Sequence, residues 1–102
     1  NYPPYTRLIK ITLKNKDLSK LIKSSNWLSE ALRNKFKSHL LGPESPLISR
    51  INNKHIKDVL IKVPANSNLK KSKVFIQKTL KSFQSISFFR NVDILIDVDP
   101  YN

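Results

Sequence analysis

The order in which two hydrophobic periodicities alternate constrains this fold more than any other feature of the chain. Apolar residues recur at every second position in Tyr5–Lys14, in His55–Val63 and again in Val92–Val98, as in strands with one buried face. Two longer stretches place apolar residues three or four positions apart, over residues 17–36 and 67–85. We therefore expect strands that alternate with amphipathic helices.

The first helical stretch should begin at Asp17, whose carboxylate can accept a backbone N–H of the first turn. Its expected buried stripe consists of Leu18, Leu21, Ile22, Ser25, Leu28, Ser29, Leu32 and Phe36. Trp27 falls outside this stripe, near the centre of the polar side. It is a candidate for stacking on a nucleic-acid base or filling a partner's pocket, and the ordinary alternative is a ring folded over lysine stems.

The segment between the helices should form a hairpin. Gly42 and Pro43 are expected to break the first helix and reset the chain direction. Leu47–Ile51 can form a short strand, and Asn52 and Asn53 tolerate the left-handed conformations of a turn. This short strand should pair in an antiparallel manner with the strand that follows the turn.

The second helix separates apolar from basic residues more completely than the first. Its expected apolar-to-small stripe is Leu69, Ser72, Phe75, Ile76, Thr79, Leu80, Phe83 and Ile86. Lys70, Lys71, Lys78 and Lys81 cluster on the opposite side, and Lys73 flanks them.

The resulting order is strand, helix, strand, strand, helix, strand, which is the split βαβ pattern of ferredoxin-like α+β proteins. Both helices should cover one face of a four-stranded antiparallel sheet. The 102 residues fit a single domain. Because the chain contains no methionine, we expect it to be a fragment of a larger protein.

Composition argues against an enzyme within these residues. Gly42 is the only glycine, so no glycine-rich loop can cradle a nucleotide phosphate, and without cysteine there is no thiolate zinc site. Asp97 and Asp99 could share one face of the last strand, but no supporting residues lie nearby in sequence, and His39 and His55 do not form a metal motif. No apolar run is long enough to cross a bilayer, and we expect no membrane partner.

The charge is distributed very unevenly. The first ninety residues contain all nineteen lysines and arginines but only four acids, a net charge of +15, whereas Asp93, Asp97 and Asp99 follow the last basic residue. Such a field attracts phosphate polymers and acidic partners. The alternative is a lysine-rich surface that is simply solvated.

Three short motifs, in order, resemble the C-terminal domain of the primosomal protein N′ (PriA) family of bacterial replication-restart helicases. They are "YPPYTRL" before a strand, "LGPESPLISRI" before a hairpin and "DILIDVDP" at the end. The resemblance covers essentially the whole chain. It implies a fold similar to that of ribosomal protein ten of the small subunit.

The resemblance also implies a function. The parent would be a cytoplasmic ATP-dependent 3′→5′ DNA helicase that assembles the primosome at stalled forks. Its ATP, magnesium and zinc would be bound upstream, with no cofactor in this fragment. The implied partners are branched or fork DNA, single-strand DNA-binding protein through its acidic tail, other primosome proteins and the upstream helicase domains.

The resemblance transfers to this sequence only in part. In the hairpin, Arg50, Lys54, His55 and Lys57 remain as basic contacts, but the family's aromatic residues are absent. Near the start of the second helix, Asn68 and Ser72 occupy the positions associated with docking of the acidic tail. The candidate binding residues are Trp27, Arg50, Lys54, His55, Lys57, Lys70, Lys71, Lys73, Lys78 and Lys81.

Two other functions fit the same sequence. One is a structural or protein-interaction domain that braces the helicase lobes or binds the acidic tail without contacting DNA. The other is a stand-alone ribosomal-like RNA binder. The acidic last strand is expected to meet a basic surface of the upstream lobes, which requires Asp97 or Asp99 to be exposed without a partner in the isolated fragment.

Overall fold

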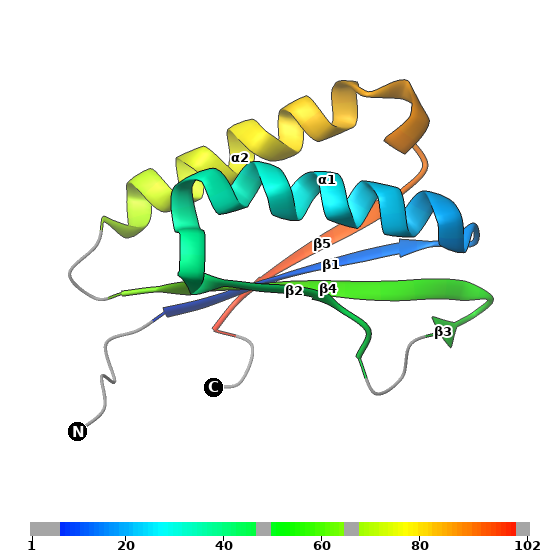
Figure 1. Ribbon diagram of the computed structural model, residues 1–102, viewed down its shortest axis with the longest axis horizontal. Helices are drawn as coiled ribbons and strands as arrows, with labels where there is room; N and C mark the ends of the chain where they lie inside the picture. Colours follow the sequence, from blue (N-terminus) through cyan, green and yellow to red (C-terminus); the bar gives the residue numbers. More distant parts are fainter. Residues whose placement is uncertain (1–6, 47–49, 65–67, 100–102) are drawn as a thin grey trace.

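The computed structural model describes residues 7–46, 50–64 and 68–99, and it has the predicted ferredoxin-like architecture. Strands β1 (Arg7–Asn15), β2 (Leu40–Glu44), β4 (Lys54–Val63) and β5 (Asp93–Val98) form an antiparallel sheet in the order β2-β4-β1-β5. Helices α1 (Leu18–Phe36) and α2 (Leu69–Ser85) lie together on one face of this sheet (Figure 1). None of the helices in the described ranges is long and apolar enough to cross a membrane.

The central strand β1 carries the middle of the core. It pairs with β4 on one side and β5 on the other, and its residues Ile9, Ile11 and Leu13 are buried beneath the helices, as predicted. Val59 and Ile61 lie opposite Ile11 and Ile9 on β4 and are also buried. The alternating pattern of both strands therefore follows from a sheet that is covered on one face.

Helix α1 begins as expected, because the Asp17 side chain accepts a hydrogen bond from the backbone N–H of Lys20. Most of the predicted stripe is buried, but Leu18 and Ile22 are exposed, contrary to prediction. The side of α1 that bears them faces β2, since Arg33 from the same side donates a hydrogen bond to the Gly42 carbonyl. Strand β2 pairs only with the middle of β4, so no β2 residue lies beneath the first turns of the helix.

The edge of the sheet beside β4 differs from the prediction. The edge strand is Leu40–Glu44 and contains the Gly42-Pro43 pair that was expected to serve only as a breaker. Gly42 has φ +105°, and a Cβ there would lie 2.7 Å from the Asp58 carbonyl oxygen. Because Gly42 has no side chain, β2 can shift its register at this point. Pro43 is tolerated because β2 is an edge strand.

Of the predicted strand Leu47–Ile51, residues 47–49 lie outside the described residues. Its last two residues form the short strand β3 (Arg50–Ile51), which pairs with the start of β4. Asn52 and Asn53 have φ values of 53° and 65° and connect the two strands, which confirms the predicted turn.

Between the helices lies an aromatic cluster. Short 3-10 helices follow both long helices, η1 at Lys37–His39 and η2 at Ser87–Phe89. Phe89 of η2 stacks on Phe83 of α2 with ring centroids 5.0 Å apart, and both are buried. This cluster joins α2 to the core at the end of the helix that leads into β5.

Candidate functional site

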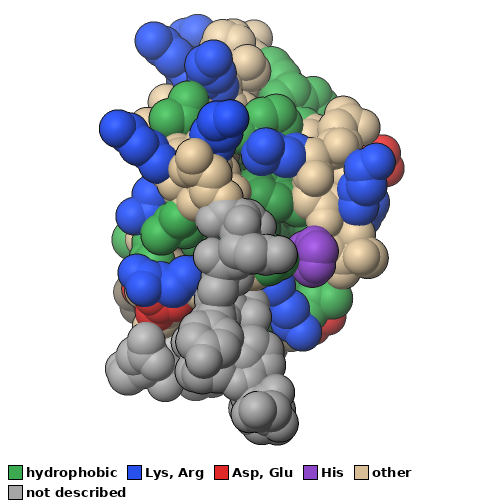
Figure 2. Space-filling model, turned by 90° about the vertical axis from the view of Figure 1, so that its left-hand side faces the viewer, with side chains coloured by type: hydrophobic (Ala, Val, Ile, Leu, Met, Phe, Trp, Pro, Cys, Tyr) green, Lys and Arg blue, Asp and Glu red, His purple; other side chains and the backbone are tan. Residues whose placement is uncertain are grey.

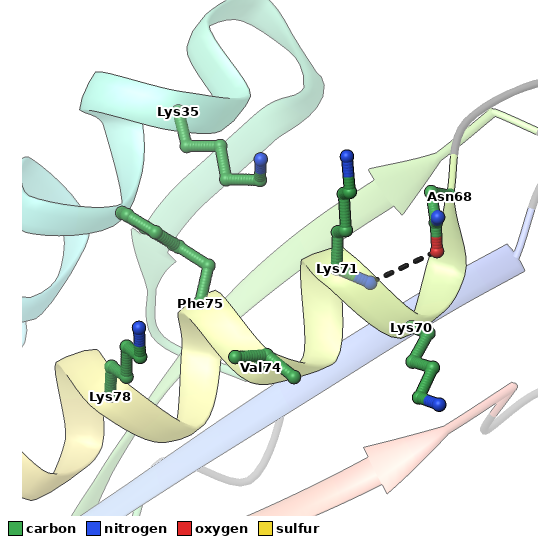
Figure 3. Close-up of a pocket in the computed structure, with 7 residues that line it drawn as sticks. All are labelled: Lys35, Asn68, Lys70, Lys71, Val74, Phe75 and Lys78. Carbon is green, nitrogen blue, oxygen red and sulfur yellow. Dashed lines mark hydrogen bonds between the residues drawn. The ribbon is translucent and has the colours of Figure 1, made fainter.

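The outer face of α2 forms a basic surface. Its seventeen residues include no acid and five lysines, all exposed: Lys70, Lys71, Lys73, Lys78 and Lys81. Within the described ranges none of these lysines takes part in an ion pair. The helix begins at Asn68, whose side chain accepts a hydrogen bond from the backbone N–H of Lys71 at 3.1 Å (Figure 3).

A shallow hollow of about 460 Å³ opens where the start of α2 passes the end of α1. It is lined by Lys35, Asn68, Lys70, Lys71, Val74, Phe75 and Lys78 (Figure 3). In the space-filling view of this end of the domain, blue basic side chains surround smaller areas of green apolar surface (Figure 2).

The apolar part of the hollow comes from two neighbouring α2 residues. Val74 is 43% exposed, and Phe75 is half-buried with its ring edge-on to Phe36 of α1, 6.0 Å between centroids. The Nζ of Lys35 lies 5.6 Å from the Phe75 ring centroid, within range of a cation–π contact. The hollow thus combines apolar contact surface with several cations that can bind an anion.

Sequence reasoning found only part of this hollow. It identified Lys70, Lys71 and Lys78, and the resemblance pointed to Asn68, but it missed Lys35 and Val74 and assigned Phe75 to the core stripe. A signal was present, because Phe75 lies at the border of the helical stripe, next to the lysine face. Lys73 and Lys81 belong to the basic surface but do not line the hollow.

The hairpin residues lie apart from the basic surface of α2. Strand β3 is at the opposite end of the sheet from the start of α2 (Figure 1). Lys54 Nζ is 2.6 Å from Asp93 Oδ2, and Lys57 Nζ donates a hydrogen bond to Ser45 Oγ at 3.0 Å. Arg50 is exposed and pairs across the strands with half-buried His55.

Trp27 is half-buried against the core, so its predicted position on the polar side is wrong. Its ring is edge-on to Phe83 at 5.8 Å and to Phe89 at 6.1 Å between centroids. The side of α1 that bears Trp27 faces α2 and η2, and the helix–helix contact covers a side chain that α1 alone would leave in solvent.

The two residues that the resemblance associates with tail docking have local structural roles. Asn68 caps α2, and Ser72 is 4% exposed and faces the core. Ser72 therefore cannot present its hydroxyl to a partner without a rearrangement of α2.

The acidic end of the chain is largely neutralised inside the domain. Asp99 Oδ2 lies 3.0 Å from Arg7 Nε, and Asp99 Oδ1 accepts a hydrogen bond from the Leu8 N–H at 3.0 Å. Asp93 pairs with Lys54. Asp99 is thus not available without a partner, whereas Asp97 is exposed and forms no ion pair within the part of the chain that is described.

Comparison with known proteins identifies a similar fold and the family of this chain. Among solved structures, the de novo designed protein Foldit4 is similar, with a TM-score of 0.66 and 10% identity over 91% of this chain and 94% of that one. At this identity the likeness shows the fold alone. No curated protein matches the sequence significantly. The family model for the primosomal protein N C-terminal domain matches residues 1–101, and the chain therefore belongs to that family.

Proposed function

We propose that this chain is the non-catalytic DNA- and protein-docking domain of an ATP-dependent 3′→5′ replication-restart helicase that acts at stalled forks in the bacterial cytoplasm. Its family gives the context of the primosome. The observation that carries the proposal is the outer face of α2, with five exposed lysines and no acid. The partners would be fork DNA, single-strand DNA-binding protein, other primosome proteins and the upstream helicase domains of the same chain.

Lysines on one helix face suit a phosphate backbone. Lys70 and Lys81 are eleven positions apart, so the basic surface runs about 16 Å along the helix at about 1.5 Å per residue. Neighbouring phosphates of one strand are about 3.4 Å apart along a duplex, so the surface can face several of them. Since a lysine is a point charge on a flexible stem, such contacts would position DNA without reading its sequence.

The salt dependence of binding tests this proposal. Replacing Lys70, Lys71, Lys78 and Lys81 together by alanine should flatten the plot of log K against log salt for fork DNA, by up to about 3.6 if each lysine neutralises one phosphate. A matched control variant replaces Lys16, Lys23, Lys62 and Arg90 by alanine. These residues are also exposed, and their replacement lowers the net charge by the same amount. An unchanged fork-DNA titration in the α2 variant would remove these lysines from the interface.

The hollow beside α2 favours a second candidate function, the docking of an acidic protein segment without DNA contact. An apolar side chain of such a segment would cover Val74 and Phe75, and its carboxylates would face Lys35, Lys71 and Lys78. The acidic tail of single-strand DNA-binding protein has the required chemistry. A structural role in bracing the helicase lobes is the other form of this function without DNA contact.

Val74→Ser separates the two functions, because it removes apolar contact surface and leaves every charge in place. Binding of an acidic peptide with a bulky apolar end should weaken severalfold, while the DNA titration stays the same. Loss of DNA binding without loss of peptide binding would contradict this assignment of the hollow.

A further inference from the structure

We propose that the outer edge of β5 is a docking site for an extended segment of a protein partner in which basic and apolar residues alternate. Strand β5 has β1 on one side and no neighbour on the other among the residues described (Figure 1). This surface is separate from the α2 lysines and does not depend on the function proposed for them.

The two edges of the sheet are built differently. On β2, a register shift, Pro43 and the Arg33 side chain bound to the Gly42 carbonyl all interfere with the addition of another strand. Strand β5 has none of these features: it contains no proline, glycine or lysine, and it pairs with β1 in unbroken register over six residues. Its free edge is therefore regular enough to accept a further strand.

Apolar side chains are exposed along both faces of β5. Ile96 and Val98 lie opposite Ile11 and Ile9, on the face that the helices cover, yet they are 42% and 37% exposed. Leu95 on the opposite face is 60% exposed. A strand laid along this edge would bury apolar surface on both sides of the sheet.

The acidic side chains of β5 favour a binding segment that carries basic residues. Asp93 and Asp97 flank Leu95 on the open face, in register with Lys14 and Lys10 of β1. Asp97 is still exposed, and the Asp93 side chain remains 57% exposed beside Lys54, so both can also face a strand on the outer side. A second copy of β5 could not satisfy them, because the strand contains no basic residue in any register. Lysine or arginine at the facing positions of another strand would instead form favourable cross-strand pairs.

The edge is also held in place before any partner arrives. Asp99 is bound to Arg7 and Leu8 directly after β5, and Asp93 is bound to Lys54 at its start. The entropy of ordering would therefore fall mainly on the incoming segment.

The test uses the ¹⁵N-labelled 102-residue chain and a ten-residue peptide of alternating lysine and valine. The titration is done near 0.15 M salt, where a Debye length of about 8 Å limits repulsion from the rest of this basic domain. We expect amide shifts along β5 and slower hydrogen exchange of its outward N–H groups. Shifts confined to other elements would overturn the proposal.

Charge reversal gives the decisive comparison. Asp97→Lys should weaken binding of the lysine peptide about tenfold and let a glutamate–valine peptide shift the β5 amides. Glu30→Lys makes the same charge change on an exposed residue of α1 and should leave β5 binding unaltered. If Asp97→Lys lowers the melting temperature, Asp97→Asn replaces it, with a smaller loss expected. Equal affinities in these variants would refute the proposal. So would self-association seen by sedimentation together with shifts of the β5 amides as the concentration of the chain rises.

Discussion

Asp99 forms an ion pair with Arg7 that ties the end of β5 to the start of β1, with 3.0 Å between Oδ2 and Nε. The other carboxylate oxygen accepts the Leu8 N–H, and the Asp99 N–H donates to the Leu8 carbonyl. Asp99 also has φ 53°, a conformation that aspartate and asparagine tolerate better than most residues. The acidic end of a basic chain thus closes the sheet against its own first strand.

Asp99→Ala should therefore lower the free energy of unfolding by about 2 kcal/mol. The Leu8 N–H loses a charged acceptor, and alanine tolerates the backbone conformation at residue 99 less well than aspartate does. Asp99→Asn keeps an acceptor and the conformation and should cost about half as much. Urea denaturation measures both. Asp97→Ala, at an exposed site two residues earlier in β5, is the control and should stay within about 0.5 kcal/mol of the parent.

Gly42→Ala should destabilise the domain by about 2 kcal/mol or more. The new Cβ would lie 2.7 Å from the Asp58 carbonyl oxygen on β4, and the backbone has φ +105°. Thermal or urea unfolding provides the measurement. Glu44→Ala, at the exposed end of the same strand, should be nearly neutral; equal losses in the two variants would show that β2 tolerates a side chain at residue 42.

Trp27→Ala should cost about 3 kcal/mol, since it removes a large ring that packs edge-on against both Phe83 and Phe89. Trp27→Phe keeps an aromatic ring there and should cost less than about 1.5 kcal/mol. Both are measured by urea unfolding followed by circular dichroism. A neutral Trp27→Ala variant would mean that the ring is not needed between the helices.

Sequence periodicity predicted the fold correctly where the buried face of a strand or helix can be recognised from that element alone. The alternation of Ile9, Ile11 and Leu13, and the helical spacing around Ser72 and Ile76, identify faces that the structure buries. The order of these elements along the chain then predicts the ferredoxin-like arrangement, which the structure confirms.

Sequence reasoning failed where burial depends on a second element. Trp27 is covered by α2 and η2, which no pattern within α1 reveals, and Ile22 is exposed because β2 is short. The strand at Leu40–Glu44 was missed because Gly42 and Pro43 usually mark a break, and only the register with β4 shows that they form part of an edge strand. Within the hollow, Lys35 comes from another helix and could not be assigned from α2 alone.

Asn68→Ala should lower the free energy of unfolding by about 1 kcal/mol, because the Lys71 N–H loses its side-chain acceptor. Asn68→Asp restores the acceptor and places a negative charge at a helix N-terminus, so it should be close to the parent in stability. Measuring acidic-peptide binding to both variants separates capping from contact. If Asn68→Asp folds normally but loses the peptide, the new carboxylate repels the ligand in the hollow.

Lys54→Ala with Lys57→Ala should change the salt dependence of DNA binding less than Lys70→Ala with Lys78→Ala. Each pair removes two charges, but Lys54 is bound to Asp93 and Lys57 to Ser45, whereas the α2 pair has no ion pair within the described residues. We expect the slope of log K against log salt to fall by up to about 1.8 for the α2 pair and to change little for the hairpin pair. Fork-DNA titrations between 50 and 200 mM salt span a range over which binding through several phosphates changes by orders of magnitude. The reverse order of effects would place the phosphate backbone at the hairpin, at the other end of the sheet, and would leave the basic surface of α2 for a protein partner.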